Sequence, residues 1–490
     1  MCIRDRHQTT LHRPQGGVFR QGLTGVHIQA RAGVGVDNVD VPAATQRGVL
    51  VVNSPEGNTI AAAEHALAMM LTLSRHIPQA HGGMRAGKWD RKKYVGNELY
   101  KKTLGVVGLG KIGSHVARVA QAMGMEVIAY DPFIAADRAQ RMQVKLLELD
   151  ELFRTADYVT LHIPRTKDTE NLVNAELLRT MKPTARIVNC ARGGVVDEAA
   201  IAEAINNGVI AGAGLDVYAS EPLAEDSPLR AVERGLVLTP HLGASTEEAQ
   251  ENVAIDVAEQ IRDVLLGLPA RSAVNIPGLS AEIMERLKPH LQLAETVGLL
   301  VSQLAGGHVK EMELRLQGEF ASHPSQPLVI AALKGLLSAG LGDSINFVNA
   351  SLEAKARGIQ VLEVKDESSR DFAGGSLQIT TRGDQGSRSV TGAVFADGDL
   401  RITSIDAFPV NVTPSSHMLF TRHRDMPGII GHLGSLLGEH NVNIASMQVG
   451  RKIVRGDAVM VLSIDDPIPA DLLQTITAIE GIQEAHPVTL

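Results

Sequence analysis

The sequence predicts an α/β protein of several domains, with parallel sheets in its first half and a small βαββαβ module at its end. Three observations lead to this fold class. Short β-rich runs alternate with helical stretches from Val26 to about Leu266. A glycine-rich turn at Gly108–Gly113 follows one strand and opens a helix. At 490 residues the chain is too long for a single hydrophobic core.

The composition excludes several classes of protein. The chain is 44% hydrophobic and 21% charged, with a net charge of −8, which argues against a nucleic-acid partner. Its two cysteines, Cys2 and Cys190, cannot build a disulfide framework, so we expect a reducing cytoplasm. No apolar stretch reaches the roughly eighteen residues of a membrane span, and we expect neither a membrane nor a metal site.

Two alternating series of strands and helices make up the first half. The first series has strands at Val26–Ala30 and Leu50–Val52 and a helix at Thr59–Arg75, which Asn58 or Thr59 is placed to cap. The second series has strands over Leu104–Val107, Val127–Tyr130, Tyr158–Ile163, Arg186–Asn189, Ala211–Val217 and Val237–Thr239, and helices over Ile112–Met123, Glu176–Thr180, Glu198–Asn206 and Glu247–Leu266.

After Leu266 the pattern changes. Pro269, Pro277 and Gly278 mark a connection that leads to a long amphipathic helix at Ala281–Leu304. Strands and helices return over Glu311–Val412, with surface turns predicted at Lys365–Gly375 and Arg382–Arg388 and a linker at Pro414–Ser416. The last module is predicted as strands Met418–Thr421, Ile444–Val449, Ala458–Ile464 and Ile482–Pro487, with helices Ile429–His440 and Ala470–Ile479, a ferredoxin-like order.

The glycine-rich turn predicts a dinucleotide site. Gly108 allows the tight turn, Gly110 lets the backbone approach a pyrophosphate, and Gly113 lets helix and strand pack closely. Lys111 and Ile112 fall in the same turn, and Asp131 ends the next strand at about the spacing where an acid meets the adenosine ribose. An acid there repels a 2′-phosphate, so NAD is favoured over NADP.

Three polar motifs follow late strands, at the sheet edge where open α/β folds build their sites. They are Asn189–Gly194 with Arg192, Leu215–Pro222 with Asp216 and Glu221, and Thr239–Ala244 with His241. Taken singly, His241 could be a strand-end histidine, Arg192 a surface cation and Glu221 a turn residue. Cys190 fits a packing residue better than a nucleophile.

Together these motifs resemble the D-2-hydroxyacid dehydrogenase family. The resemblance implies that His241 is the acid/base on the substrate oxygen, that Glu221 orients its ring, and that Arg192 binds the carboxylate. It also implies a set of residues around the cofactor: Gly108, Gly110, Lys111, Ile112, Gly113, Asp131, Cys190, Ala191, Arg192, Asp216, His241, Gly243 and Ala244.

The upstream half carries further signals of the family's phosphoglycerate dehydrogenases. The loop with Gly33, Val34 and Gly35 resembles the one that holds the substrate carboxylate, and Asn58 resembles a substrate-contacting residue. The basic stretch Lys88–Lys93, Arg91 above all, resembles a segment that reaches towards a substrate phosphate, although a solvated basic loop is the alternative for its lysines.

The C-terminal part resembles the intervening domain and the ACT domain of the long-form enzymes. By resemblance, L-serine would bind at His423, Asp425 and Asn443 across an ACT pair, although Asp425 stands where some members use Asn. The implied fold is two Rossmann-like doubly wound domains (substrate and NAD), an intervening α/β regulatory domain and a ferredoxin-like ACT domain. The expected boundaries are 1–97, 98–266, 267–304 for a return segment, 305–413 and 414–490.

The resemblance implies NAD-dependent oxidation of 3-phospho-D-glycerate to 3-phosphohydroxypyruvate, the first step of L-serine biosynthesis, by a homodimer or homotetramer. The alternatives are a glyoxylate or hydroxypyruvate reductase, another D-2-hydroxyacid dehydrogenase and, more remotely, an NAD-sensing corepressor-type scaffold. The first twenty-five residues do not match the family, and Thr10 falls about where a phosphate-holding cation would lie. We therefore expect a truncated or misassembled start.

Overall fold

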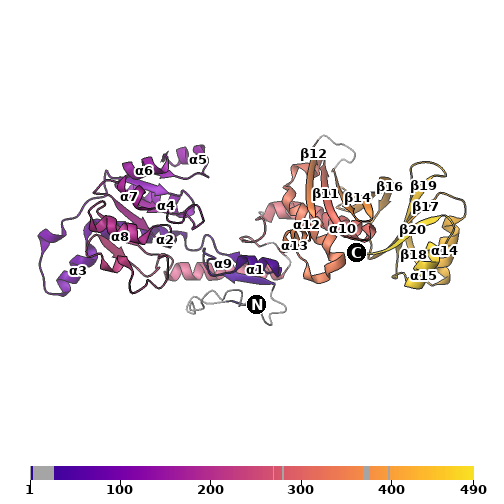
Figure 1. Cartoon of the computed structure of the whole chain (residues 1–490), viewed down its shortest axis with the longest axis horizontal. Helices are drawn as coiled ribbons and strands as arrows, with labels where there is room; N and C mark the ends of the chain where they lie inside the picture. The colour runs from indigo at the N-terminus through magenta and orange to yellow at the C-terminus, as the bar shows by residue number, and fades with distance from the viewer. Residues whose placement is uncertain are drawn as a thin grey trace. The chain divides into compact units, whose positions relative to one another are not determined.

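The computed structural model describes residues 2–3, 27–266, 268, 270–278, 281–367, 375–395 and 398–490 (Figure 1). The chain divides into two compact units, one of residues 1–31, 36–53 and 260–490, the other of residues 32–35 and 54–259. Val26, Pro269 and Thr10, on which expectations were placed, lie outside the described residues. No helix within the described ranges is long and apolar enough to cross a membrane.

The second unit is built on a seven-stranded sheet in which every neighbouring pair is parallel. The strand order is β10-β9-β8-β7-β4-β5-β6, so the chain starts in the middle and winds outward in both directions. This is the doubly wound order that the sequence predicts. The strands are β4 (Thr103–Val107), β5 (Glu126–Tyr130), β6 (Lys145–Leu146), β7 (Tyr158–Leu161), β8 (Arg186–Asn189), β9 (Gly212–Leu215) and β10 (Leu236–Leu238).

Helices cover both faces of this sheet. Side chains alternate across a strand, so Val106 of β4 packs in one buried cluster with α2 and α4, while Val107 packs in another with α6, α7 and α8. The helices of this unit are α2 (Thr59–Arg75), α3 (Ile77–Arg85), α4 (Lys111–Ala122), α5 (Ala136–Arg141), α6 (Leu149–Thr155), α7 (Ala175–Arg179) and α8 (Glu198–Asn206), with 3₁₀ turns η1 (Arg91–Tyr94) and η2 (Pro228–Ala231); α9 (Glu247–Leu265) runs from this unit into the other.

The first unit contains three sheets. A small parallel sheet is formed by β1 (Cys2–Ile3), β2 (Ile28–Arg31) and β3 (Leu50–Asn53), next to α1 (Val41–Gln46). A six-stranded sheet has the order β12-β11-β13-β14-β15-β16. Its strands are β11 (Val309–Gln317), β12 (Gln360–Asp366), β13 (Ser376–Gly383), β14 (Gly386–Val394), β15 (Leu400–Ile405) and β16 (Phe408–Val412), and its helices are α10 (Ala281–Ala305), α11 (Glu319–Ser322), α12 (Ser325–Leu341) and α13 (Ala350–Ala356), with η3 (Gly342–Ser344).

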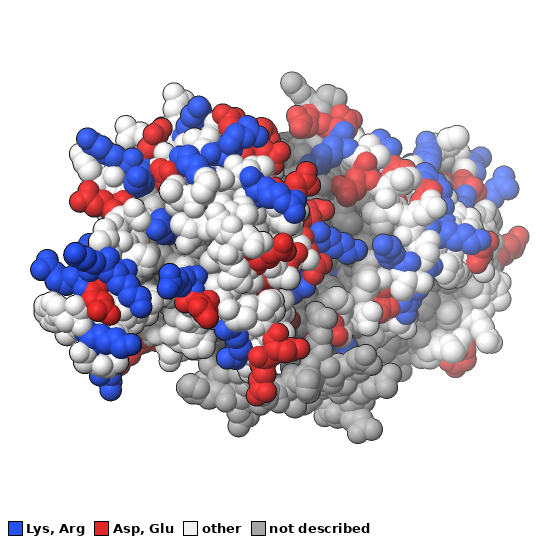
Figure 2. All heavy atoms as spheres, turned by 60° about the vertical axis from the view of Figure 1, so that its left-hand side comes forward, with Lys and Arg blue, Asp and Glu red and all other residues white. Residues whose placement is uncertain are grey.

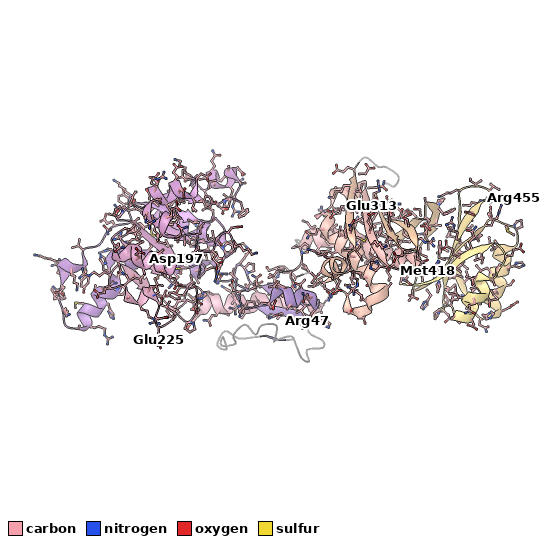
Figure 3. All side chains as sticks on the ribbon, viewed as in Figure 1. Arg47, Asp197, Glu225, Glu313, Met418 and Arg455 are labelled. Atoms are coloured by element: carbon pink, nitrogen blue, oxygen red, sulfur yellow. The ribbon has the colours of Figure 1, made fainter. Side chains whose placement is uncertain are left out.

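The third sheet is antiparallel, with the order β18-β19-β17-β20. Its strands are β17 (His417–Arg424), β18 (Ile444–Arg451), β19 (Asp457–Ile464) and β20 (Ile482–Thr489), and α14 (Ile429–Glu439) and α15 (Ala470–Thr477) cover one face. The predicted βαββαβ module is therefore confirmed. The other face, which carries Met418 (labelled in Figure 3), belongs to the same hydrophobic core as the six-stranded sheet.

Two predicted surface turns are wrong in part. Lys365 and Asp366 end strand β12, and only 384–385 separate β13 from β14 within the stretch Arg382–Arg388. Arg382 is accommodated in its strand because it pairs with Glu311 and Glu313 of the neighbouring strand. Residues 368–374 of the first predicted turn lie outside the described residues.

Candidate active site

The three polar motifs meet at one edge of the seven-stranded sheet. Strands β8, β9 and β10 are neighbours and parallel, so their carboxyl ends lie side by side. The turns that follow them carry Arg192, Glu221 and His241 within one compact unit. This edge is where parallel sheets place their ligand sites.

His241 and Glu221 form an ion pair. His241 Nδ1 lies 2.7 Å from Glu221 Oε2. The hydrogen bond to Glu221 raises the pKa of His241 above its ordinary value, against the opposing effect of burial. Burial favours the neutral acid at Glu221, but the hydrogen bond and charge of His241 outweigh it and hold the pKa of Glu221 below its ordinary value. With Nδ1 engaged, Nε2 of His241 is the nitrogen left to exchange a proton.

The backbone at His241 adopts an unusual conformation. Its φ is 54°, in the left-handed region that few residues other than glycine adopt. The His241 N–H donates to the carbonyl oxygens of Asp216 (2.8 Å) and Thr239 (3.0 Å), which hold the turn in place. A strained residue fixed by its surroundings is typical of functional sites.

The buried side chain of Asp216 is held by several hydrogen bonds at this edge of the sheet. Its carboxylate has no exposed surface, and it accepts hydrogen bonds from Thr239 Oγ1 (2.6 Å), Leu242 N (2.8 Å) and Gly243 N (2.8 Å). Burial favours the neutral acid, but the hydrogen bonds, led by that of His65, outweigh it and lower the pKa of Asp216. His65 and Thr239 were not singled out in the sequence, because an isolated histidine in an apolar helix resembles a packing residue.

The turn after β8 presents Arg192. The Asn189 side chain accepts from Ala191 N (3.0 Å) and donates to the Arg192 carbonyl (3.0 Å), so the amide fixes the turn from inside. A Cβ at Gly193 would lie 1.7 Å from the Tyr218 carbonyl oxygen, so only glycine fits there. Burial and then the charge of Asp216 raise the pKa of the Cys190 thiol far above its usual range, which suits a packing residue and not a nucleophile.

The glycine-rich turn between β4 and α4 fits a dinucleotide. Gly108 has φ 93°, and a Cβ there would press against the carbonyl of His162. A Cβ at Gly110 would meet no atom within 4 Å, so this side of the turn is open, at the N-terminus of α4. Asp131 accepts from Leu109 N (2.8 Å) and Phe133 N (2.9 Å), so its carboxylate is fixed beside the turn. Lys111 pairs with Glu56, and Ile112 packs against the core.

The predicted substrate loop lies in the same unit. Gly33 has φ 142°, its carbonyl accepts from Ser54 N (3.0 Å), and Val34 and Gly35 follow it. Asn58 precedes α2, but the prediction that its side chain or that of Thr59 caps the helix is wrong, because neither makes that bond. The Asn58 Oδ1 is buried and, among the described residues, has no hydrogen-bond partner. Such an acceptor can take a hydrogen bond from a bound molecule.

Arg91 lies on the surface, at the start of a 3₁₀ turn. It begins η1, and the stretch Lys88–Lys93 is exposed throughout. Figure 2 shows basic and acidic side chains interspersed over one face of the molecule, without a broad field of either sign.

Of the predicted effector residues, His423 lies in strand β17, Asp425 follows that strand and Asn443 precedes strand β18, and all three already have protein partners. The Asp425 carboxylate accepts from Arg451 (2.8 Å) and from the N–H of Arg455 (3.1 Å), in the β18–β19 turn labelled in Figure 3. The Asn443 amide donates to Asp465 (2.7 Å). His423 is buried, which lowers its pKa.

Comparison with known proteins bears out the resemblance. Residues 67–243 match the NAD-binding domain of D-isomer specific 2-hydroxyacid dehydrogenases. Residues 286–406 match the D-3-phosphoglycerate dehydrogenase intervening domain, and residues 417–481 match the ACT domain. The chain belongs to the D-isomer-specific 2-hydroxyacid dehydrogenase family and is an NAD-dependent dehydrogenase.

Several of its relatives within the family are named D-3-phosphoglycerate dehydrogenase. The protein from Synechocystis is 63% identical over 94% of this chain and 83% of its own length. That from Archaeoglobus fulgidus is 43% identical over 96% of this chain and 89% of its own length. That from Bacillus subtilis is 41% identical over 94% and 87%.

Proposed function

We propose that the chain oxidises 3-phospho-D-glycerate to 3-phosphohydroxypyruvate with NAD, the step that opens L-serine biosynthesis. The observation that carries the reaction class is the His241–Glu221 pair, 2.7 Å apart at the sheet edge that Arg192 shares. The names of the relatives, at up to 63% identity, support this substrate above other hydroxy acids.

His241 is the proton acceptor in this proposal. Its Nε2 takes the proton of the substrate hydroxyl, while Glu221 accepts the Nδ1–H and stabilises the imidazolium that forms. In the reverse reaction the same imidazolium returns the proton to the carbonyl oxygen. A raised pKa suits both directions, because the ring must change charge near neutral pH.

Other residues bind and orient the substrate. The guanidinium of Arg192 pairs with the carboxylate and polarises the reacting carbon–oxygen bond. Backbone N–H groups of the Gly33–Gly35 loop hold the same carboxylate, and the unpaired Oδ1 of Asn58 accepts from a substrate hydroxyl. Arg91 of the basic stretch supplies charge for the phosphate.

The dinucleotide is held by the turn Gly108–Gly113 and by Asp131, which accepts from the ribose hydroxyls. When bound, NAD supplies the acceptor of the hydride. Cys190, Ala191, Asp216, Gly243 and Ala244 line the place of its nicotinamide in this proposal, and the Asp216 network keeps that wall rigid.

The proposal extends to regulation and organisation. The ACT domain is a site for an amino-acid effector, L-serine, at His423, Asp425 and Asn443. The chain works as a homodimer or homotetramer in the cytoplasm. Its domains are 1–97, 98–266, 267–304, 305–413 and 414–490.

The direct test is NADH production from 3-phospho-D-glycerate, followed at 340 nm and compared with glycerate, with reduction of glyoxylate, and with added L-serine. We expect turnover of the phosphorylated acid and inhibition by serine. If the enzyme turns over only glycerate or glyoxylate, the proposed substrate is wrong and the chain is a glyoxylate or hydroxypyruvate reductase. NAD binding without turnover of any acid would favour a scaffold.

Replacing Glu221 by glutamine should move the pH profile. Because Glu221 raises the pKa of His241, its loss lowers that pKa. Oxidation needs neutral His241 and fails below its pKa, so the acidic limb of kcat/KM moves to lower pH. Reduction needs the imidazolium and fails above the pKa, so its basic limb also moves to lower pH. Limbs that stay in place in both directions would contradict the pairing.

A further inference from the structure

Helix α2 contributes a histidine, His65, to the base of the proposed site. Its Nε2 lies 3.2 Å from Thr239 Oγ1 and 3.2 Å from Asp216 Oδ1. The side chain of His65 is 19% exposed and that of Asp216 is not exposed at all. The contact therefore lies in the protein interior, where polar groups need hydrogen-bond partners.

The donors and acceptors of these hydrogen bonds follow from the number of protons that Thr239, Asp216 and His65 can donate. Thr239 has one hydroxyl proton, and the 2.6 Å distance to Asp216 Oδ1 places that proton on the line to the carboxylate. Thr239 can then only accept from His65, and an ionised Asp216 can only accept as well. His65 Nε2 must therefore carry a proton and share it between the two oxygens.

Asp216 also forms hydrogen bonds with the loop that bears His241. Its carboxylate accepts from Leu242 N and Gly243 N, and its carbonyl accepts from His241 N. A buried carboxylate stays ionised only when its partners replace the lost hydration. Its described partners are two backbone N–H groups, a hydroxyl and the imidazole of His65, and the imidazole is the one that comes from helix α2, far away in the sequence.

We propose that His65 is a positioning residue: its Nε2–H keeps the Asp216 carboxylate ionised and in place, and Asp216 holds the 241–243 loop that presents His241. The inference rests on the proposed function, since it matters for turnover only if His241 is the acid/base. Cys190 lies within 4.8 Å of the ligand atoms of both residues, a spacing that could admit a cation. Because both oxygens of Asp216 already accept hydrogen bonds, the group is a hydrogen-bond network.

The first test uses the protein without cofactor or substrate. His65→Leu removes the hydrogen-bond donor but keeps a side chain of similar volume. His65→Gln keeps an N–H group at about the same distance from the backbone. In wild type, His65→Leu should lower the melting temperature of this unit by about 3–10 °C. In an Asp216→Asn background the same change should cost less than half as much. Equal losses in both backgrounds would overturn the inference, whatever the enzyme's activity.

The second test separates positioning from packing. His65→Leu should lower kcat by roughly ten- to a hundredfold, the effect of a misplaced catalytic loop, and His65→Gln should recover most of that loss. Glu64→Gln, an exposed change one residue away on α2, is the control and should leave kcat within about twofold. Equal kcat values for the Leu and Gln variants would show a packing role and overturn the inference. A wild-type chain inactive on 3-phospho-D-glycerate would instead overturn the proposed substrate, and the melting experiment would still decide for His65.

Discussion

Replacing His241 by asparagine lowers kcat/KM for 3-phospho-D-glycerate by about a hundred- to ten-thousandfold, the contribution of a positioned acid/base. Asparagine is the sharper substitution because it tolerates the left-handed backbone found at this position, where φ is 54°. Alanine would remove the imidazole but add strain, so a loss of activity could reflect a disordered turn.

The controls for His241→Asn are its melting temperature and its affinity for NADH, measured by fluorescence titration. Both should stay near the wild-type values, because the backbone bonds to Asp216 and Thr239 do not involve the ring. A variant that folds, binds NADH and keeps more than about a tenth of the wild-type kcat/KM would show that another group moves the proton.

Replacing Arg192 by lysine is expected to cost about a hundredfold or more in kcat/KM. Lysine keeps the charge but loses the planar fork, and two charge-assisted hydrogen bonds to the carboxylate and the reacting oxygen account for a loss of this size. KM should rise and kcat should fall, because the guanidinium binds the substrate in the ground state and polarises the carbonyl in the transition state.

The turn itself should survive the Arg192 substitution. Asn189 fixes it through the backbone of Ala191 and Arg192, and lysine keeps a donor for the Ala191 carbonyl, to which the Arg192 guanidinium donates (2.8 Å), so the melting temperature should change little. Arg179→Lys, on the exposed side of α7, is the matched control and should be silent. Partial recovery of Arg192→Ala by added guanidinium ions would strengthen the assignment, and an unchanged kcat/KM in Arg192→Lys would refute it.

Much of the nucleotide-binding fold was predictable because its signals are local. The apolar spacing of Thr59–Arg75 predicts α2 with the observed bounds, and the buried runs predict strands β4, β5, β7 and β8 to within two residues. Helices α3, α5 and α6 were missed. The first of these contains two adjacent glycines, Gly82 and Gly83, which disfavour a helix, and it buries none of its residues.

The sequence predicted the catalytic residues of the site but not the hydrogen bonds that link them to helix α2. His241 and Glu221 stand in motifs that follow strands, so their meeting followed from sheet order. His65, Asp216 and Thr239 are far apart in sequence and meet only because α2 packs under β9 and β10. The capping role given to Asn58 was wrong because its side-chain oxygen makes no hydrogen bond to the helix N-terminus, and no sequence pattern reveals which partner such an oxygen takes.

The hydrophobic core shared by the last two sheets has a mechanical consequence. Met418, Phe420 and Val461 of the C-terminal sheet pack in one cluster with Leu300 of α10 and Ile402 of β15. We therefore expect the two sheets to unfold together as one cooperative unit. We therefore expect that a ligand which rigidifies the C-terminal module would also slow hydrogen exchange in α10 and in the six-stranded sheet, because they share this core.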